Sequence, residues 1–109
     1  MPYPTRGRFI TKAEADTLVN AFKSSPTHYN GVNGGFYGKE LIQKLLDQAG
    51  CDGIRYYHGL GPDATDGGKV KQTIVLVAED ADGNTLTTAI LEDGPLCPPF
   101  CWLDAGLGS

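Results

Sequence analysis

The sequence predicts an α+β fold in which two helices pack on a three-stranded antiparallel meander, with an extended arm at each end. Three observations lead to this prediction. Apolar residues recur at helical spacing in two segments before residue 50, and they alternate with a period of two after it. Two stretches that lack either period and contain prolines and glycines, 1–9 and 93–109, flank these patterns. We therefore expect one domain over residues 1–109, with its core in 10–92 and the two arms outside it.

The first helix is predicted to begin after Thr11. Thr11 and Glu14 form a capping box, in which each side chain accepts a hydrogen bond from a backbone N–H that the first turn leaves without a partner. An apolar stripe at helical spacing follows and consists of Ala15, Leu18, Val19 and Phe22. Pro26 ends the helix because proline disfavours helical geometry in the residue before it. We expect the stripe to belong to the core.

A glycine-rich loop, 27–38, separates this helix from a second one over 39–49, which Gly50 ends. Three strands are predicted after it, over 51–60, 70–79 and 85–91, and the residues 80–84 have the composition of a hairpin turn. Two helices can cover one face of such a sheet. The other face and at least one sheet edge then need a cover of another kind.

Composition narrows the function classes. The chain has 109 residues, a net charge of −4 and a pI of about 4.9, which gives no general attraction to nucleic acid. Tyr56 and Tyr57 beside Arg55 could stack bases, but no basic groove accompanies them, so packing in the core or an interface is expected. No window is long and apolar enough to span a membrane, and nothing indicates a cofactor or a small-molecule substrate. The first residues lack a secretory signal, so we expect a cytoplasmic protein and leave export by a signal-independent route open.

Charge is distributed unevenly along the chain. Residues 1–50 carry six Lys or Arg and four Asp or Glu, a net +2, whereas residues 51–109 carry three and nine, a net −6. The first twelve residues hold Arg6, Arg8 and Lys12 and no acid. This asymmetry is typical of solvated surface, and it also suits a chain whose basic end contacts the acidic half of a neighbouring copy.

The three cysteines leave several alternatives open. Cys97 and Cys101 form the one close pair, and they could make a structural disulfide if the chain leaves the cytoplasm. Cys51, Cys97, Cys101 and His58 are weak zinc candidates because they follow no standard ligand spacing. A thiol active site would need Cys51 beside His28 or His58. We expect reduced, half-buried thiols, no catalytic residue and no resident metal.

Four short motifs point to a group of related proteins. They are the segment Gly50–Gly59 (G-C-x-G-I-R-x-Y-x-G), the aromatic pair of Phe36-Tyr37-Gly38, the strand Thr73–Val77 followed by Asp-x-x-Gly-Asn, and the C-P-x-x-C of Cys97–Cys101. Over residues 36–101 this pattern resembles a group of short, uncharacterised bacterial proteins. No activity is assigned to that group, so the resemblance implies only that the cysteine turn and the Gly-Ile-Arg strand belong to one architecture.

The two arms carry the candidate functional residues. These interface candidates are Tyr3, Arg6, Arg8, Phe9, Phe100, Trp102, Leu103 and Leu107. An arm laid across a neighbouring copy would bury its apolar side chains and cover an open sheet edge. We therefore expect a non-enzymatic, self-assembling structural or scaffold subunit whose partner is a copy of itself. Such a homo-oligomer is a filament or tube if the contact does not close, and a ring if it does.

Two alternatives remain at this point. The chain could be a small binding or regulatory module, or a metal- or thiol-dependent protein built on its cysteines and histidines. The sequence also leaves open whether the arms dock on their own body or on a neighbour.

Overall fold

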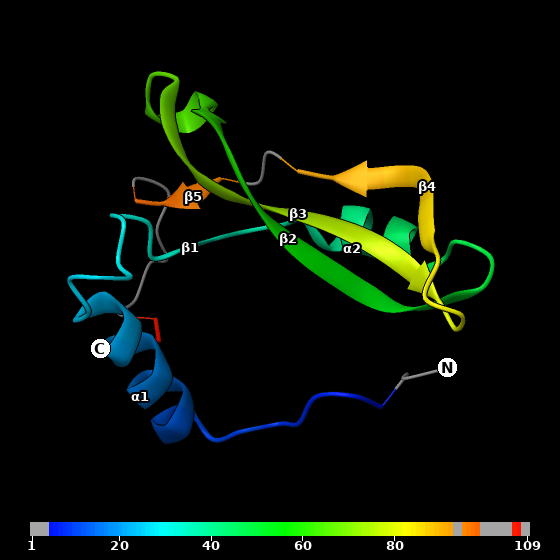
Figure 1. Ribbon diagram of the computed structural model, residues 1–109, viewed down its shortest axis with the longest axis horizontal. Coiled ribbons are helices and arrows are strands. Elements are labelled where there is room, and N and C mark those ends of the chain that lie inside the picture. Colours follow the sequence, from blue (N-terminus) through cyan, green and yellow to red (C-terminus); the bar gives the residue numbers. More distant parts are fainter. Residues whose placement is uncertain (1–4, 93–94, 99–105, 108–109) are drawn as a thin grey trace.

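The computed structural model describes residues 5–92, 95–98 and 106–107. Its elements are α1 (Lys12–Lys23), β1 (Gly34–Gly35), α2 (Lys39–Leu46), β2 (Cys51–Asp63), a 3-10 turn (Ala64–Asp66), β3 (Lys69–Asp80), β4 (Thr85–Leu91) and β5 (Leu96–Cys97). Figure 1 shows their arrangement. The predicted α+β class, with two helices and a three-stranded antiparallel meander, is confirmed.

The main sheet has the strand order β2-β3-β4, so β2 and β4 are its edges. β2 and β3 form a long antiparallel hairpin whose register runs from Ile54 opposite Ala78 to Asp63 opposite Lys69. A bulge interrupts this pairing between Cys51 and Gly53. The hairpin is longer than the sequence predicted, because the pairing continues past Leu60 to the 3-10 turn.

The turn between β3 and β4 is the predicted hairpin turn. Asp80 Oδ1 accepts hydrogen bonds from the backbone N–H groups of Asp82 (2.9 Å) and Asn84 (2.8 Å). These bonds stabilise the ionised carboxylate, and the bond from Asn84 is the main reason that the pKa of Asp80 is lowered. Gly83 has a φ of +85°, a left-handed conformation that glycine adopts without steric cost.

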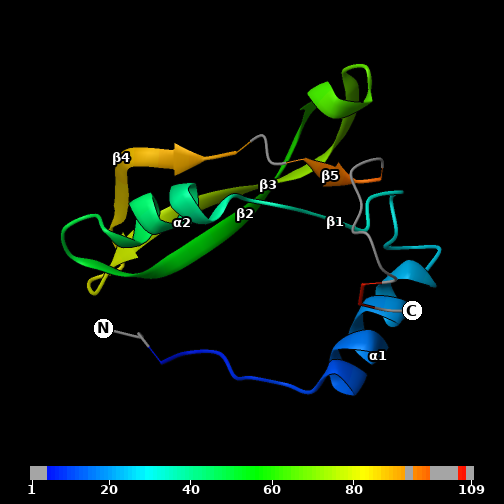
Figure 2. The same cartoon turned by 180° about the vertical axis from the view of Figure 1, so that it is seen from behind.

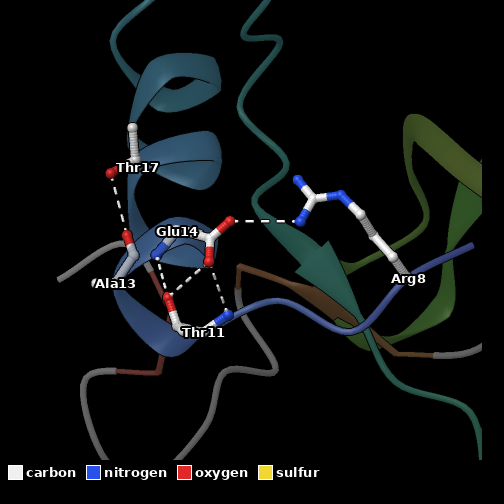
Figure 3. Close-up of polar contacts among 5 residues, drawn as sticks. All are labelled: Arg8, Thr11, Ala13, Glu14 and Thr17. Carbon is white, nitrogen blue, oxygen red and sulfur yellow. Dashed lines mark hydrogen bonds and ion pairs between the residues drawn. The ribbon is translucent and has the colours of Figure 1, made fainter.

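Both helices begin where the sequence predicts, and they differ in packing. The capping box of α1 is present: the Glu14 N–H donates to Thr11 Oγ1 (3.1 Å), and the Thr11 N–H donates to Glu14 Oε1 (3.4 Å; Figure 3). α2 lies against the sheet and buries Leu45, whose exposed fraction is 1%. α1 lies apart from the sheet in both views (Figures 1 and 2) and has no buried residue. The expectation that both helices pack on the meander is therefore wrong for α1.

The structure also contains a second, two-stranded sheet that the sequence did not predict. β1 pairs with β5, with Gly34 opposite Cys97 and Gly35 opposite Leu96. A Cβ on Gly35 would lie 3.1 Å from Leu96 Cδ2 and 3.2 Å from the Pro95 carbonyl oxygen, so a larger residue there would force its neighbours to shift. This pairing holds the segment before α2 beside β5, and α1 lies apart from the main sheet. The pairing also places residues 95–98 in the body, so the C-terminal arm does not begin at residue 93 as predicted.

A nearly buried ion cluster ties the hairpin tip to this second sheet. The Lys71 ammonium lies 2.7 Å from Asp66 Oδ2 and 3.1 Å from Asp63 Oδ2, and it donates to the Pro98 carbonyl at 2.8 Å. The side chains of Lys71 and Asp63 are 12% and 4% exposed. The Lys71 hydrogen bond lowers the pKa of Asp66, and the Asp66 hydrogen bond raises the pKa of Lys71. The cluster thus joins β2, β3 and the segment after β5.

The core is small for a chain of this length. Among the described residues, five apolar side chains are buried: Leu45, Val77, Ala78, Leu96 and Cys97. They come from α2, β3 and β5, so neither α1 nor the described residues before it contribute to the core. Substitutions within α2 should therefore affect stability far more than substitutions within α1.

We expect Leu45→Ala to lower the free energy of unfolding by about 2–5 kcal/mol, since it leaves a cavity beneath α2. The matched variant Leu41→Ala lies on the same helix, where its side chain is 46% exposed. Leu41→Ala should therefore lower the free energy of unfolding by clearly less than Leu45→Ala does. Urea denaturation followed by circular dichroism measures both, and equal losses would show that α2 does not cover the core.

The ion cluster gives a second stability prediction. Lys71→Met leaves the Asp63 carboxylate buried with its ammonium partner removed, so the variant should unfold at a lower temperature than the wild type. Lys69→Met removes an exposed lysine from the same strand end and should change the free energy of unfolding by less than about 0.5 kcal/mol. Calorimetric midpoints compare the two, and a Lys71→Met variant as stable as Lys69→Met would contradict the anchoring role.

Candidate interaction surface

The N-terminal arm is the most exposed part of the described chain. Every described residue from Thr5 to Ile10 is exposed, and the Phe9 ring is fully so. Arg8 forms an exposed ion pair with Glu14 of the first turn of α1 at 3.4 Å (Figure 3). Gly7 has a φ of +100° and marks the bend between the two arginines. The Phe9 ring therefore does not fold back onto the body of its own chain.

The apolar stripe of α1 adds to this uncovered surface. Leu18 is 62% exposed and Phe22 is 36% exposed, although Phe22 meets Tyr29 edge to face at a centroid distance of 5.5 Å. The stripe was predicted to be core, and that prediction is wrong because α1 lies away from the sheet. Its pattern correctly indicated a face that favours contact with other apolar groups, but it carried no information on which partner provides that contact.

β2 presents a second uncovered surface at the edge of the main sheet. Its backbone bonds outside the regular elements occur at its two ends, where the Cys51 N–H donates to the Gln48 carbonyl (3.0 Å) and the Asp63 carbonyl accepts from Gly68 (2.9 Å). In the described chain, no backbone group outside the sheet pairs with the outer edge of 52–62. Natural edge strands usually carry charges, prolines or bulges that prevent such an edge from accepting another strand.

Large side chains line this edge. Tyr56, Tyr57 and Leu60 are 63%, 51% and 80% exposed. The Tyr56 ring meets His58 edge to face at 5.8 Å, and His58 Nδ1 lies 2.7 Å from Gln72 Nε2 on β3. Tyr56 and Tyr57 are neighbours in the strand and lie on opposite faces of β2, so each face presents an exposed aromatic ring.

The cross-strand pair Arg55–Glu79 sets the electrostatics of the β2 edge. Arg55 Nη2 donates to Glu79 Oε1 at 2.8 Å, and Arg55 Nε also donates to the same carboxylate. The hydrogen bond from Arg55 lowers the pKa of Glu79, and the same bond raises the pKa of Arg55. Because the two charges pair with one another, the edge presents aromatic rings beside a neutral ion pair.

An open cavity of about 880 Å³ lies between Arg6 of the arm and the β2–β3 hairpin, where Glu79 of β3 also lines it. It is lined by Arg6 from the arm and by β2 residues that include Asp52, Ile54, Tyr56 and His58. The sequence predicted Arg6 as an interface residue, and it predicted that a sheet edge needs cover. It did not predict that these two features face each other across one cavity.

The structure describes four of the predicted interface residues. Arg6, Arg8, Phe9 and Leu107 are all exposed, Leu107 at 46%. Tyr3, Phe100, Trp102 and Leu103 lie outside the described residues.

The cysteine candidates are not brought together as a metal site in the part of the chain that is described. Cys51 is a free, half-buried thiol whose Sγ lies 3.5 Å from the Gly53 carbonyl. Cys97 is disulfide-bonded, so it offers no thiolate to a metal, and Cys101 lies outside the described residues. Within the described ranges no three His, Cys, Asp or Glu side chains gather as a metal site would require. The expectation of reduced thiols is wrong for Cys97.

Compared with known proteins, the chain matches no family model, no curated protein and no solved structure. Among the residues described, no helix has the length and apolar character needed to cross a membrane.

We expect Arg55→Met to return the pKa of Glu79 towards its ordinary value, because the variant removes the hydrogen bond that lowers it. A carboxyl with a lowered folded pKa contributes stability above its unfolded pKa and loses it as the pH falls through the folded pKa. The stability difference between wild type and Arg55→Met should therefore be present near neutral pH and shrink below about pH 4. Carbon-detected NMR titration of Glu79 and denaturation at several pH values measure both effects.

Lys39→Met is the control, since it removes an exposed cation from the start of α2, remote in sequence from this pair. A stability difference that is equally large at acid and neutral pH would show that Arg55 acts through packing and not through the Glu79 charge.

Proposed function

We propose that this chain is a non-enzymatic structural subunit that assembles with copies of itself through its terminal arms. The observation that carries the proposal is the amount of surface that the single chain leaves uncovered. Its accessible surface is 7791 Å², whereas a compact monomer of this mass exposes about 5,800 Å². The excess is roughly 2,000 Å².

The excess area can be compared with the area that protein–protein interfaces bury. A stable protein–protein contact buries about 800 Å² on each partner, so a subunit with two neighbours buries about 1,600 Å². The radius of gyration of 15.3 Å also exceeds the roughly 13 Å of a compact domain of this length. Both quantities suit a subunit that becomes compact only within an assembly.

The chemistry of the uncovered surface favours a copy of the same chain as the partner. The exposed apolar groups Phe9, Leu18 and Phe22 are followed in sequence by an acidic second half, and the arm itself is basic. A basic donor and an acidic acceptor on the same chain form a head-to-tail contact between different surfaces. Such contacts give a filament or tube when they do not close, and a ring when they do.

The disulfide at Cys97 bears on where such an assembly would form. Disulfides persist in oxidising compartments and are rare in the cytoplasm. It therefore favours assembly in an oxidising compartment over the expected cytoplasmic location.

We expect deletion of residues 1–9 to convert the assembly into soluble, folded monomer, because the deletion removes the basic donor and the exposed Phe9 ring. The same outcome is expected for deletion of residues 102–109. Light scattering over a range of protein concentrations measures the mass, and circular dichroism verifies the fold. Electron microscopy of the wild type distinguishes fibres from rings.

Raising the salt concentration should weaken wild-type assembly, since the contact pairs a basic with an acidic surface. Normal assembly of both truncated chains would show that the arms do not hold the copies together. A wild-type chain that stays monomeric at micromolar concentration, whatever the salt, would favour the small binding module instead.

A further inference from the structure

We infer that the acceptor in this assembly is the outer edge of β2, to which the arm of a neighbouring copy, residues 5–10, adds as a further strand. The inference rests on the proposed function and identifies the surface that the arm occupies. An added strand pairs its backbone with the open N–H and C=O groups of an edge and fixes its own side chains in alternate directions.

The first reason is that β2 has the longest uncovered edge in the described chain. The bulge between Cys51 and Gly53 disrupts one end of the edge, and Gly61 with Pro62 weakens the other. The run between them, 54–60, contains neither proline nor lysine. Its one formal charge, Arg55, pairs with Glu79. This run therefore lacks the features that keep a natural edge strand from pairing.

Length and chemistry fit the arm to that run. Six residues in extended conformation cover about 20 Å, the length of six residues of the strand beside them. Phe9 can pack against Tyr56 or Tyr57, an aromatic cross-strand pair of the kind that stabilises sheets. Gly7, now at a φ of +100°, can adopt extended geometry, and a Cβ at that position would meet no atom within 4 Å.

The position of the chain's own arm argues for a neighbour as the donor. Strands that pair lie about 4.8 Å apart and leave no space between their backbones. A cavity of about 880 Å³ lies between Arg6 of the arm and β2 of the same chain, so these two segments are not paired. Within the described ranges, no backbone hydrogen bond joins 5–10 to β2. Asp52, at the start of β2, lines this cavity together with Arg6 of the chain's own arm.

The edges of the sheet offer a matched test. Tyr56→Lys/Tyr57→Lys places two positive charges on β2, where they face the basic arm, and removes two aromatic contacts. Ile90→Lys places one positive charge at a 56% exposed position on β4, the opposite edge. We expect the β2 variant to raise the concentration needed for half assembly by roughly tenfold or more, and Ile90→Lys to change it little. Sedimentation velocity measures the mass distribution, and circular dichroism confirms that each full-length variant folds.

Mixing two defective chains makes the test specific. Phe9→Asp disrupts the donor arm and leaves the β2 edge unchanged. The β2 variant disrupts the edge and leaves the arm unchanged. Each alone should be monomeric, and the mixture should give a 1:1 dimer that grows no further, because one donor and one acceptor remain. If the double tyrosine variant unfolds, Tyr57→Lys alone replaces it in the same mixture.

Each result has one meaning. A 1:1 dimer together with normal assembly of Ile90→Lys supports the inference. Assembly of the β2 variant at wild-type concentrations, or a mixture that stays monomeric, overturns it. If Phe9→Asp is monomeric in that case, arm-mediated assembly stands and the acceptor lies elsewhere. A monomeric wild type would overturn the proposed function itself.

Discussion

The Lys71 ammonium holds together parts of the chain that apolar packing alone leaves apart. It contacts Asp63 and Asp66 at the hairpin tip and the carbonyl of Pro98 after β5, and its side chain is almost fully covered. A charge in that position is stable only while its partners stay in place, because its desolvation must be offset by those contacts. With so few apolar residues buried, polar contacts of this kind decide how the two sheets meet. The hydrogen bond from the Tyr37 hydroxyl to the Ile74 carbonyl works in the same direction.

The same polar contacts explain why so much apolar surface stays uncovered. The pairing of β1 with β5 satisfies the backbone of a glycine-rich segment and fixes where it runs. α1, which precedes that segment, lies apart from the main sheet (Figure 2). The helix keeps a well-made N-terminus and an apolar stripe, but the body of its own chain gives the stripe little cover. A surface left open for this reason is suited to a partner, and the arm, α1 and the edge of β2 all belong to it.

Local features of this fold could be predicted from the sequence, and long-range ones could not. The capping box at Thr11, the start of α2 at Lys39 and the bounds of β4 depend on neighbouring residues, so their patterns are complete within short windows. α2 ends earlier than predicted, at Leu46, because the last turn before Gly50 leaves helical geometry. The two glycines of β1 form no sequence pattern that predicts a strand, and β5, the strand with which they pair, is far away in sequence. The candidate surface follows the same division: the place of residues 1–9 outside the core was predicted, whereas the place of α1 and the cavity beside β2 depend on the tertiary arrangement.

The pairing of β1 with β5 also has a consequence for the order in which the chain acquires its structure. Contacts between residues distant in sequence form late, because the intervening loop must first lose conformational entropy, whereas helices form within microseconds. Gly34 cannot meet Cys97 until the residues between them, which include β2, β3 and β4, have been synthesised. α1 and the segment before it therefore mature early, and the body closes last. A nascent chain accordingly presents α1 and the arm before it while the second sheet is still open, so the small sheet is the last part of the described fold to close.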